Sequence, residues 1–121
     1  MQDKKCKVDI DNRTYNFALE VVRIVRSLPK ETAGFELGKQ FLRSATSIAA
    51  NIEEAQSAFS KQDFIYKMNI SLKEARETKL WINLIRDAAL MKGEAERFAY
   101  LSGECQQIIS ILIRIIKNSK L

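Results

Sequence analysis

Histidine is absent from the 121-residue sequence, and proline and glycine are scarce, with one proline and four glycines. The lack of histidine removes the commonest general base and the usual nitrogen ligand of zinc. No two of the glycines are spaced as in a P-loop or a dinucleotide-binding loop. We therefore expect a protein that is not an enzyme and that has no catalytic residues, no cofactor site and no metal site.

Cysteine is also rare, since the chain has only Cys6 and Cys105. Two distant cysteines do not form the framework of a secreted disulfide-rich domain, and we expect free thiols in a reducing compartment. The N-terminal residues are charged and contain no apolar segment typical of a signal peptide. The longest apolar segment, residues 108–116, is interrupted by Arg114, and a membrane span needs about 20 residues. The sequence predicts a soluble, cytoplasmic protein without membrane contact.

The composition is that of one folded, helical domain. Hydrophobic residues make up 46% and charged residues 29% of the chain, as in ordinary globular proteins. Apolar residues recur every three or four positions in four segments, which is the helical period. We predict an all-α, antiparallel up-down-up-down four-helix bundle that spans residues 1–121. An irregular N-terminal arm (residues 1–10) is expected to precede helices at about 11–28, 35–57, 61–91 and 94–118.

The third segment has the clearest local start signal. Ser60 is a good N-cap, and Asp63 three residues later resembles the acidic half of a capping box. Phe59 and Phe64 occupy the two positions of a hydrophobic staple. At the other end of this helix, Gly93 after Lys92 is expected to be the C-terminal glycine.

Small side chains dominate residues 44–55 (SATSIAANIEEA). Ala45, Ile48 and Ile52 form the apolar stripe of this segment, and the small residues around them would let a neighbouring helix approach closely. Asn51 is either buried, with hydrogen bonds that fix the register of the helices, or solvated.

The last segment carries a broader apolar surface than one side of a bundle helix requires. Either its C-terminal half is central in the bundle, or it also lines an interface between subunits. No helix of an up-down-up-down bundle is central, so we favour a homo-oligomer. The interface is predicted at four isoleucines: Ile109, Ile111, Ile113 and Ile116.

Basic residues offer the only functional surface that the sequence indicates. The net charge is +5, which permits contact with polyanions. Several Lys and Arg follow helical spacing and could contact phosphates without reading bases; the alternative is an ordinary solvated face. The candidate nucleic-acid-binding residues are Arg23, Arg26, Lys30, Lys39, Arg43, Arg114, Lys117 and Lys120.

A series of linked positions resembles a known family. In order, the chain has Leu42-Arg43-Ser44, Ser47-Ile48, Asn51-Ile52 with Glu54, Ser60, Asp63-Phe64, Ser71-Leu72-Lys73-Glu74 and Glu77-Thr78. These resemble the four-helix bundle proteins of which some are encoded by intervening sequences in large-subunit ribosomal RNA genes. The similarity covers residues 15–91 well, and the last helix matches only in pattern. Glu53 and Ala55 depart from the family, in which Ala and Gly are common at these positions.

The resemblance implies a homopentamer. Similar proteins are accessory factors to the reverse transcriptases of diversity-generating retroelements, in which a basic pentamer contacts nucleic acid and the polymerase. We therefore expect a non-enzymatic oligomer that binds structured RNA or DNA through backbone phosphates, with a polymerase-type protein as a further partner. The alternative is a protein-interaction scaffold without direct nucleic-acid contact.

Overall fold

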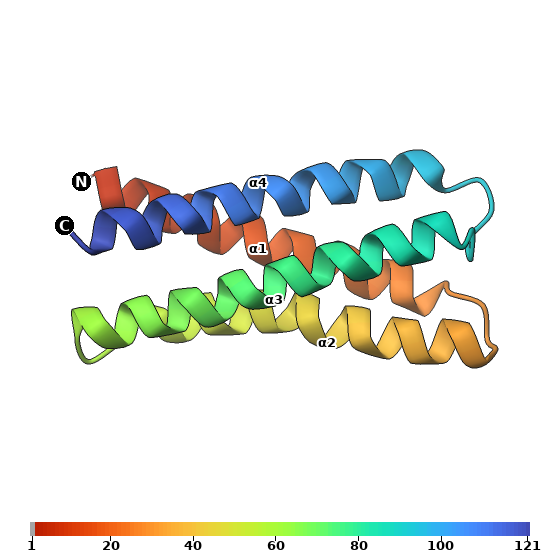
Figure 1. Cartoon of the computed structure of the whole chain (residues 1–121), viewed down its shortest axis with the longest axis horizontal. Helices are drawn as coiled ribbons and strands as arrows, with labels where there is room; N and C mark the ends of the chain where they lie inside the picture. Colours follow the sequence, from red (N-terminus) through yellow and green to blue (C-terminus); the bar gives the residue numbers. More distant parts are fainter. Residues whose placement is uncertain (1) are drawn as a thin grey trace.

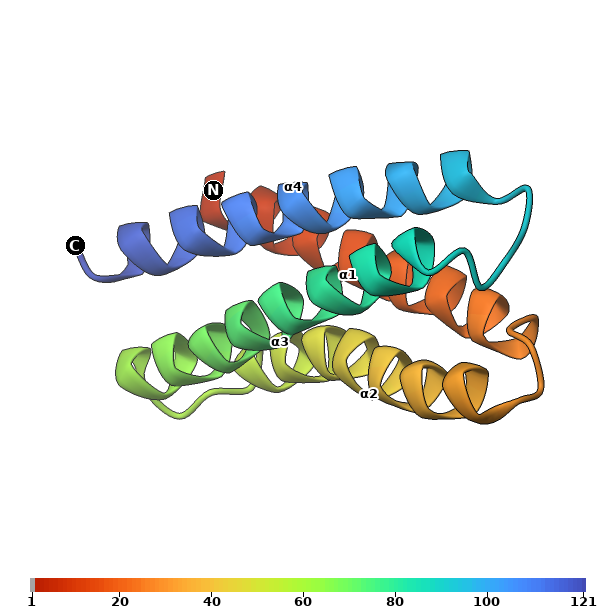
Figure 2. The same cartoon turned by 45° about the vertical axis from the view of Figure 1, so that its right-hand side comes forward.

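Four antiparallel helices make up the computed structural model, which describes the backbone of residues 2–121 and the side chains from Ile10 onward. Each helix packs on its neighbours in the chain and α1 packs on α4, whereas the backbones of the diagonal pairs lie further apart over the described residues (Figures 1 and 2). The predicted all-α four-helix bundle is confirmed. The helices are α1 (Gln2–Arg26), α2 (Thr32–Ala55), α3 (Lys61–Asp87) and α4 (Ala95–Ser119).

The first helix is longer than the sequence indicated. It begins at Gln2, so the irregular arm predicted for residues 1–10 was wrong. The helix begins before the predicted start at about residue 11, and its core-facing side includes Ile10, which is fully buried. The Thr14 hydroxyl is also buried and donates a 2.7 Å hydrogen bond to the Ile10 carbonyl. Met1 and the side chain of Cys6 lie outside the described residues.

A tight turn connects α1 to α2. Glu31 is the N-cap of α2, and its carboxylate accepts a 3.1 Å hydrogen bond from the Gly34 backbone N–H. Carboxylates suit this position because the first N–H groups of a helix have no partner within the helix. Helix α2 therefore begins at Thr32, three residues before the predicted start.

The start of α3 follows the prediction in part. Ser60 is the N-cap, and its hydroxyl accepts a 3.0 Å hydrogen bond from the Asp63 N–H. The predicted staple was wrong, because the side chain of Phe59 is fully exposed and cannot pack on Phe64.

The end of α3 lies earlier than predicted. The helix stops at Asp87, and Ala89 adopts a left-handed conformation with φ of 53°. The Leu90 N–H then donates to the Ile85 carbonyl, the long hydrogen bond of a Schellman motif. Gly93, which also has a positive φ, lies in the connection to α4 and does not end the helix.

Helices α2 and α3 approach each other closely through small polar residues. The Thr78 hydroxyl donates to the Ser44 hydroxyl at 2.8 Å, and the Ser71 hydroxyl donates to the Ile48 carbonyl at 2.9 Å. All three hydroxyl-bearing residues are fully buried. The small residues of α2 thus serve the close contact that the sequence suggested. Asn51 does not fix the register between helices, because its side-chain amide donates its hydrogen bonds to Ser47 of the same helix.

Candidate nucleic-acid interface

The basic residues predicted to bind phosphates fall into three places. One residue, Arg43, lies midway along α2. A second group lies where α1 ends and α2 begins, and a third lies at the C-terminal end of α4. The two groups are at opposite ends of the bundle (Figure 1), so one short phosphate stretch cannot contact all eight residues.

Arg43 is held by carboxylates of the neighbouring helix. Its guanidinium pairs with Glu74 at 3.3 Å and also donates to Glu77. The Trp81 indole N–H donates to the same Glu77 carboxylate at 3.0 Å. Hydrogen bonds from Arg43 and then from Trp81 lower the pKa of Glu77 below its ordinary value. Two carboxylates neutralise Arg43, so we remove it from the candidate phosphate contacts.

We expect Arg43→Met to reduce stability in a pH-dependent way. The pKa of Glu77 is lowered in the folded state, so the ion pair stabilises the fold above the ordinary glutamate pKa and loses this effect as the pH falls through the lowered pKa. The Arg43 side chain is 47% exposed, and solvent screening limits the expected loss at pH 7 to about 0.5–1 kcal/mol.

Urea denaturation of wild type and variant at pH 7 and pH 3 measures this difference. It should be largest at pH 7 and shrink at pH 3. Arg76→Met is the matched control, because Arg76 is exposed on α3 and forms no ion pair within the described part of the chain. An equal loss from both variants, or a loss that does not change with pH, would contradict the role of the Glu77 pair.

An exposed cationic group surrounds the connection between α1 and α2. It consists of Arg23, Arg26, Lys30 and Lys39, which we call the α1–α2 basic end; all four are exposed. Arg23 has only a weak intrahelical partner, Glu20 at 3.4 Å. Among the acidic residues of this end, Glu31 is engaged as the cap of α2. Four exposed cations at one end can contact successive phosphates without base reading.

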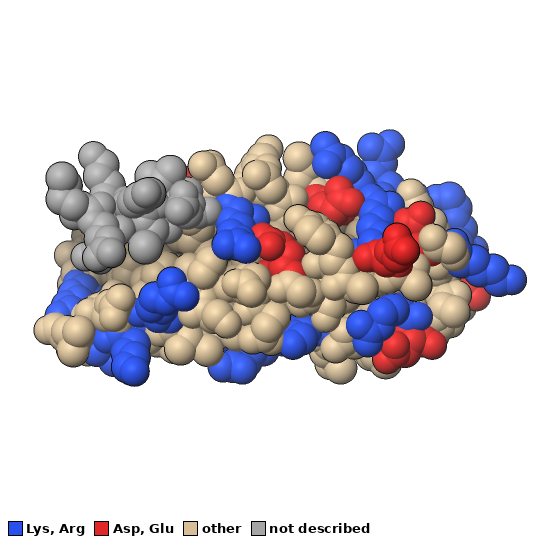
Figure 3. Space-filling model, turned by 90° about the horizontal axis from the view of Figure 1, so that it is seen from above, with Lys and Arg blue, Asp and Glu red and all other residues tan. Residues whose placement is uncertain are grey.

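The third group consists of Arg114, Lys117 and Lys120, all exposed. Figure 3 shows cationic side chains at both ends of the face that carries α4. Part of this group borders a groove between α3 and α4, where Lys117 and Lys120 lie next to Leu72 and Ile113. These lysines thus border an apolar surface.

The four isoleucines predicted at a subunit interface do not lie together on the surface. Ile109 and Ile116 are buried in the bundle core, so the chain's own helices already cover most of their surface. Ile111 is half-buried, and only Ile113 is substantially exposed, at 42%. The broad apolar surface of α4 therefore mainly serves the chain's own core, and the interface at these four residues stays a prediction.

Ion pairs between α1 and α4 were not predicted. Arg13 pairs with Glu104 at 2.7 Å, and Arg97 pairs with Glu20 at 2.7 Å. The hydrogen bond from Arg97 is the main reason why the pKa of Glu20 is lowered. Helices α1 and α4 pack less closely than the other neighbouring pairs. These charges therefore join the loosest pair of helices, and their pairing depends on helix rotation that the sequence does not specify.

The remaining chemistry of the described residues is structural. Cys105 is buried, and burial raises the pKa of its thiol to about 12, so it remains protonated at neutral pH. Within residues whose side chains are described, no three Cys, Asp or Glu are grouped to hold a metal ion. The same part of the chain has no helix that is apolar over the length needed to cross a bilayer.

Comparisons with known proteins agree with this architecture. The model of a family described as 23S rRNA-intervening sequence protein matches residues 7–114. A 1.70 Å crystal structure, of a protein with unknown function from the S23 ribosomal protein family of Bacteroides thetaiotaomicron VPI-5482, is 38% identical to this chain. The similarity covers 93% of this chain and 98% of that chain, with a TM-score of 0.84. No curated protein matches the chain. The similarity therefore includes α4, which the sequence pattern had matched only weakly.

Proposed function

The chain belongs to the 23S rRNA-intervening sequence protein family, and from this membership and its charge distribution we propose a non-enzymatic, cytoplasmic, homo-oligomeric bundle that binds RNA or DNA through backbone phosphates. The α1–α2 basic end is the proposed contact surface. An accessory role beside a nucleic-acid enzyme, and assembly as a pentamer, follow from the resemblance noted above. The observation that carries the proposal is the exposure of Arg23, Arg26, Lys30 and Lys39 at one end of the bundle.

Charge and symmetry support this proposal together. One copy has a net charge of +5, and each copy offers only a small basic surface. A closed homo-oligomer would repeat that surface at fixed spacing. Repeated weak contacts can bind a polyanion much more tightly than one contact does. Exposed cations repeated on a symmetric assembly suit recognition of the phosphate backbone, which requires no side chain placed against a base edge.

Fluorescence anisotropy of labelled structured RNA and duplex DNA tests the proposal. If each complex involves about four phosphate contacts, the affinity should fall about a hundredfold between 50 and 200 mM salt, because bound cations are released from the nucleic acid. Arg26→Glu combined with Lys39→Glu should weaken binding strongly. The matched control is Arg76→Glu combined with Lys73→Glu, which changes the net charge equally on exposed positions of α3.

Equal losses from the two double variants would overturn the assignment to the α1–α2 basic end and indicate a general charge effect. Absence of binding even at 50 mM salt would overturn nucleic-acid binding as a whole. That second result would favour the protein-interaction scaffold, in which the basic residues serve only solubility.

A further inference from the structure

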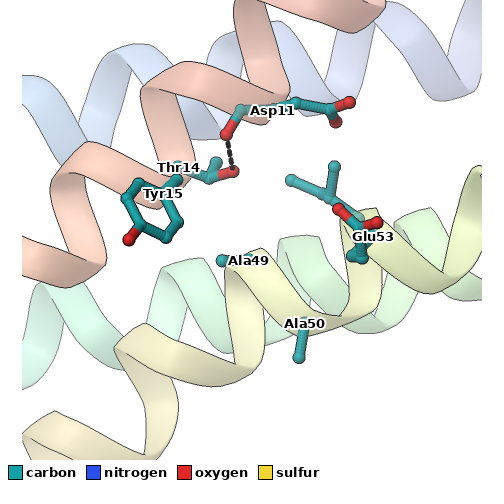
Figure 4. A pocket seen from close by; sticks show the side chains of 7 residues that line it. Asp11, Thr14, Tyr15, Ala49, Ala50 and Glu53 are labelled. Atoms are coloured by element: carbon teal, nitrogen blue, oxygen red, sulfur yellow. Dashed lines mark hydrogen bonds between the residues drawn. The ribbon is translucent and has the colours of Figure 1, made fainter.

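Two grooves lie on opposite sides of the bundle and differ in charge. The first, the α1/α2 groove, has a volume of about 240 Å³ and runs between Tyr15 on α1 and Ala49, Ala50 and Glu53 on α2. Figure 4 shows Tyr15 and Asp11 on the α1 side and the two short alanines on the α2 side. Tyr15 is 63% exposed. The small side chains of α2 leave a hollow with an acidic residue, Glu53, at its border.

The second groove, the α3/α4 groove, has a volume of about 320 Å³. Its apolar part is formed by Leu72, Ile113 and Ile116, and its border by Lys117 and Lys120. Neither lysine has an ion-pair partner within the described residues. Ile113 is among the more exposed aliphatic residues of the chain, although it lies beside the core residue Ile116.

The arrangement of the helices places the two grooves on opposite sides at the same end of the molecule. Over the described residues the helices neighbour each other in the order α1, α2, α3, α4 and back to α1, and the diagonal backbones lie further apart. The α1/α2 side therefore faces away from the α3/α4 side. Glu53 lies near the end of α2 and Lys117 near the end of α4. Both helices end on the side where the C-terminus lies (Figure 1).

We infer that the α3/α4 groove of one copy docks on the α1/α2 groove of the next copy, with Ile113 over Ala50 and Lys117 against Glu53. This inference rests on the self-association that is part of the proposed function, and it names the two surfaces. An exposed branched aliphatic side chain meets a hollow lined by alanines, and a basic border meets an acidic one. Since the two surfaces differ, the contact is heterologous and repeats from copy to copy. Such a contact forms a ring where the rotation between copies closes and an open filament where it does not.

A second copy suits the α3/α4 groove better than a nucleic acid does. The groove is lined by aliphatic side chains and has no aromatic residue on which a base could stack. Phosphate contacts need cations but no apolar surface beside them. The acidic surface on the opposite side of the same chain, at the same end, supplies the matching charge. The proposed nucleic-acid contact is at the other end of the bundle, so the two roles do not compete for the same residues.

Charge reversal with rescue tests this docking. Glu53→Lys and Lys117→Glu should each lower the mass measured by light scattering toward the 13.9 kDa of one chain, because each variant opposes like charges across the contact. The double variant E53K/K117E restores opposite charges and should recover the wild-type mass. Glu36→Lys is the matched control, since Glu36 is exposed toward the opposite end of α2; its mass should not change.

A variant that changes no charge provides a second test. Ala50→Trp should fill the hollow and also lower the mass, while circular dichroism confirms that the exposed position leaves the helices intact. An oligomer whose mass is unaffected by E53K, K117E and A50W would overturn this docking and leave self-association at other surfaces. A monomeric wild-type protein would overturn both the docking and the proposed self-association. Fluorescence anisotropy of labelled nucleic acid, with the charge variants of the α1–α2 basic end, measures nucleic-acid binding independently of either result.

Discussion

Gly34→Ala is expected to lower the free energy of unfolding by about 3 kcal/mol, at the upper end of the range for overpacked positions. A Cβ atom on Gly34 would lie 1.9 Å from the Pro29 carbonyl oxygen and 3.0 Å from its carbon. Both are backbone atoms, so no side-chain rotation can relieve the contact. The turn between α1 and α2 must open, and the hydrogen bond from the Gly34 N–H to Glu31 is expected to be lost with it.

Two other helical glycines serve as controls for this prediction. Nothing lies within 4 Å of a Cβ on Gly103, so Gly103→Ala should stabilise the protein by about 0.5–1 kcal/mol through reduced backbone entropy of the unfolded chain. A Cβ on Gly38 would meet the end of the flexible Leu28 side chain at 3.0 Å, and an intermediate effect is expected. Urea denaturation followed by circular dichroism measures all three. Equal stability of the Gly34 and Gly103 variants would contradict the proposed clash.

The helical bundle could be predicted because the sequence signals for its helices are local and recur along the chain. Apolar residues at helical spacing define the inward side of each helix, and Ser60 marks the start of α3 by a hydrogen bond to a residue three positions away. The end of α3 was predicted less well. The sequence has its turn signal at Gly93, whereas the chain turns at Ala89, and the half-buried Leu90 that packs against the core is part of this turn. Tertiary packing here overrides local conformational preference.

The sequence identifies basic and apolar residues, but it does not predict which of them are paired or exposed in the fold. In the sequence, Arg43 and Arg26 are both basic residues at helical spacing. In the structure, the rotation of α2 places Arg43 opposite two carboxylates of α3. Ile109 and Ile113 both belong to the apolar C-terminal segment, yet one is buried and the other exposed. Such differences depend on how far neighbouring helices rotate and separate. That geometry is set by contacts such as those of Ser44 and Thr78, which sequence periodicity does not describe.

Ser71→Leu is expected to destabilise the protein about as strongly as Gly34→Ala. The Ser71 hydroxyl lies 2.9 Å from the Ile48 carbonyl of α2, so the position faces a neighbouring backbone directly and has no room for a longer side chain. Overpacking should cost about 1–3 kcal/mol, and the lost hydrogen bond about 0.5–1.5 kcal/mol more. Thermal or urea denaturation measures the loss.

Ser71→Ala separates the two contributions, because it removes the hydroxyl and adds no volume. It should cost only about 0.5–1.5 kcal/mol, the usual contribution of one hydrogen bond. If Ser71→Leu cost no more than Ser71→Ala, the two helices could not be as close as their hydrogen bonds indicate.

The double variant S71L/R43M tests whether the ion pairs of Arg43 with α3 depend on the short distance between α2 and α3 at Ser71. Arg43 reaches Glu74 and Glu77 across the α2–α3 contact, and Ser71 lies on α3 one turn before Glu74. A leucine that pushes the helices apart should already weaken the Arg43 ion pairs. The combined loss of stability should therefore be smaller than the sum of the two single losses, as is found for residues that share one structural unit. Strictly additive losses would instead mean that the ion pairs adjust independently of the helix separation.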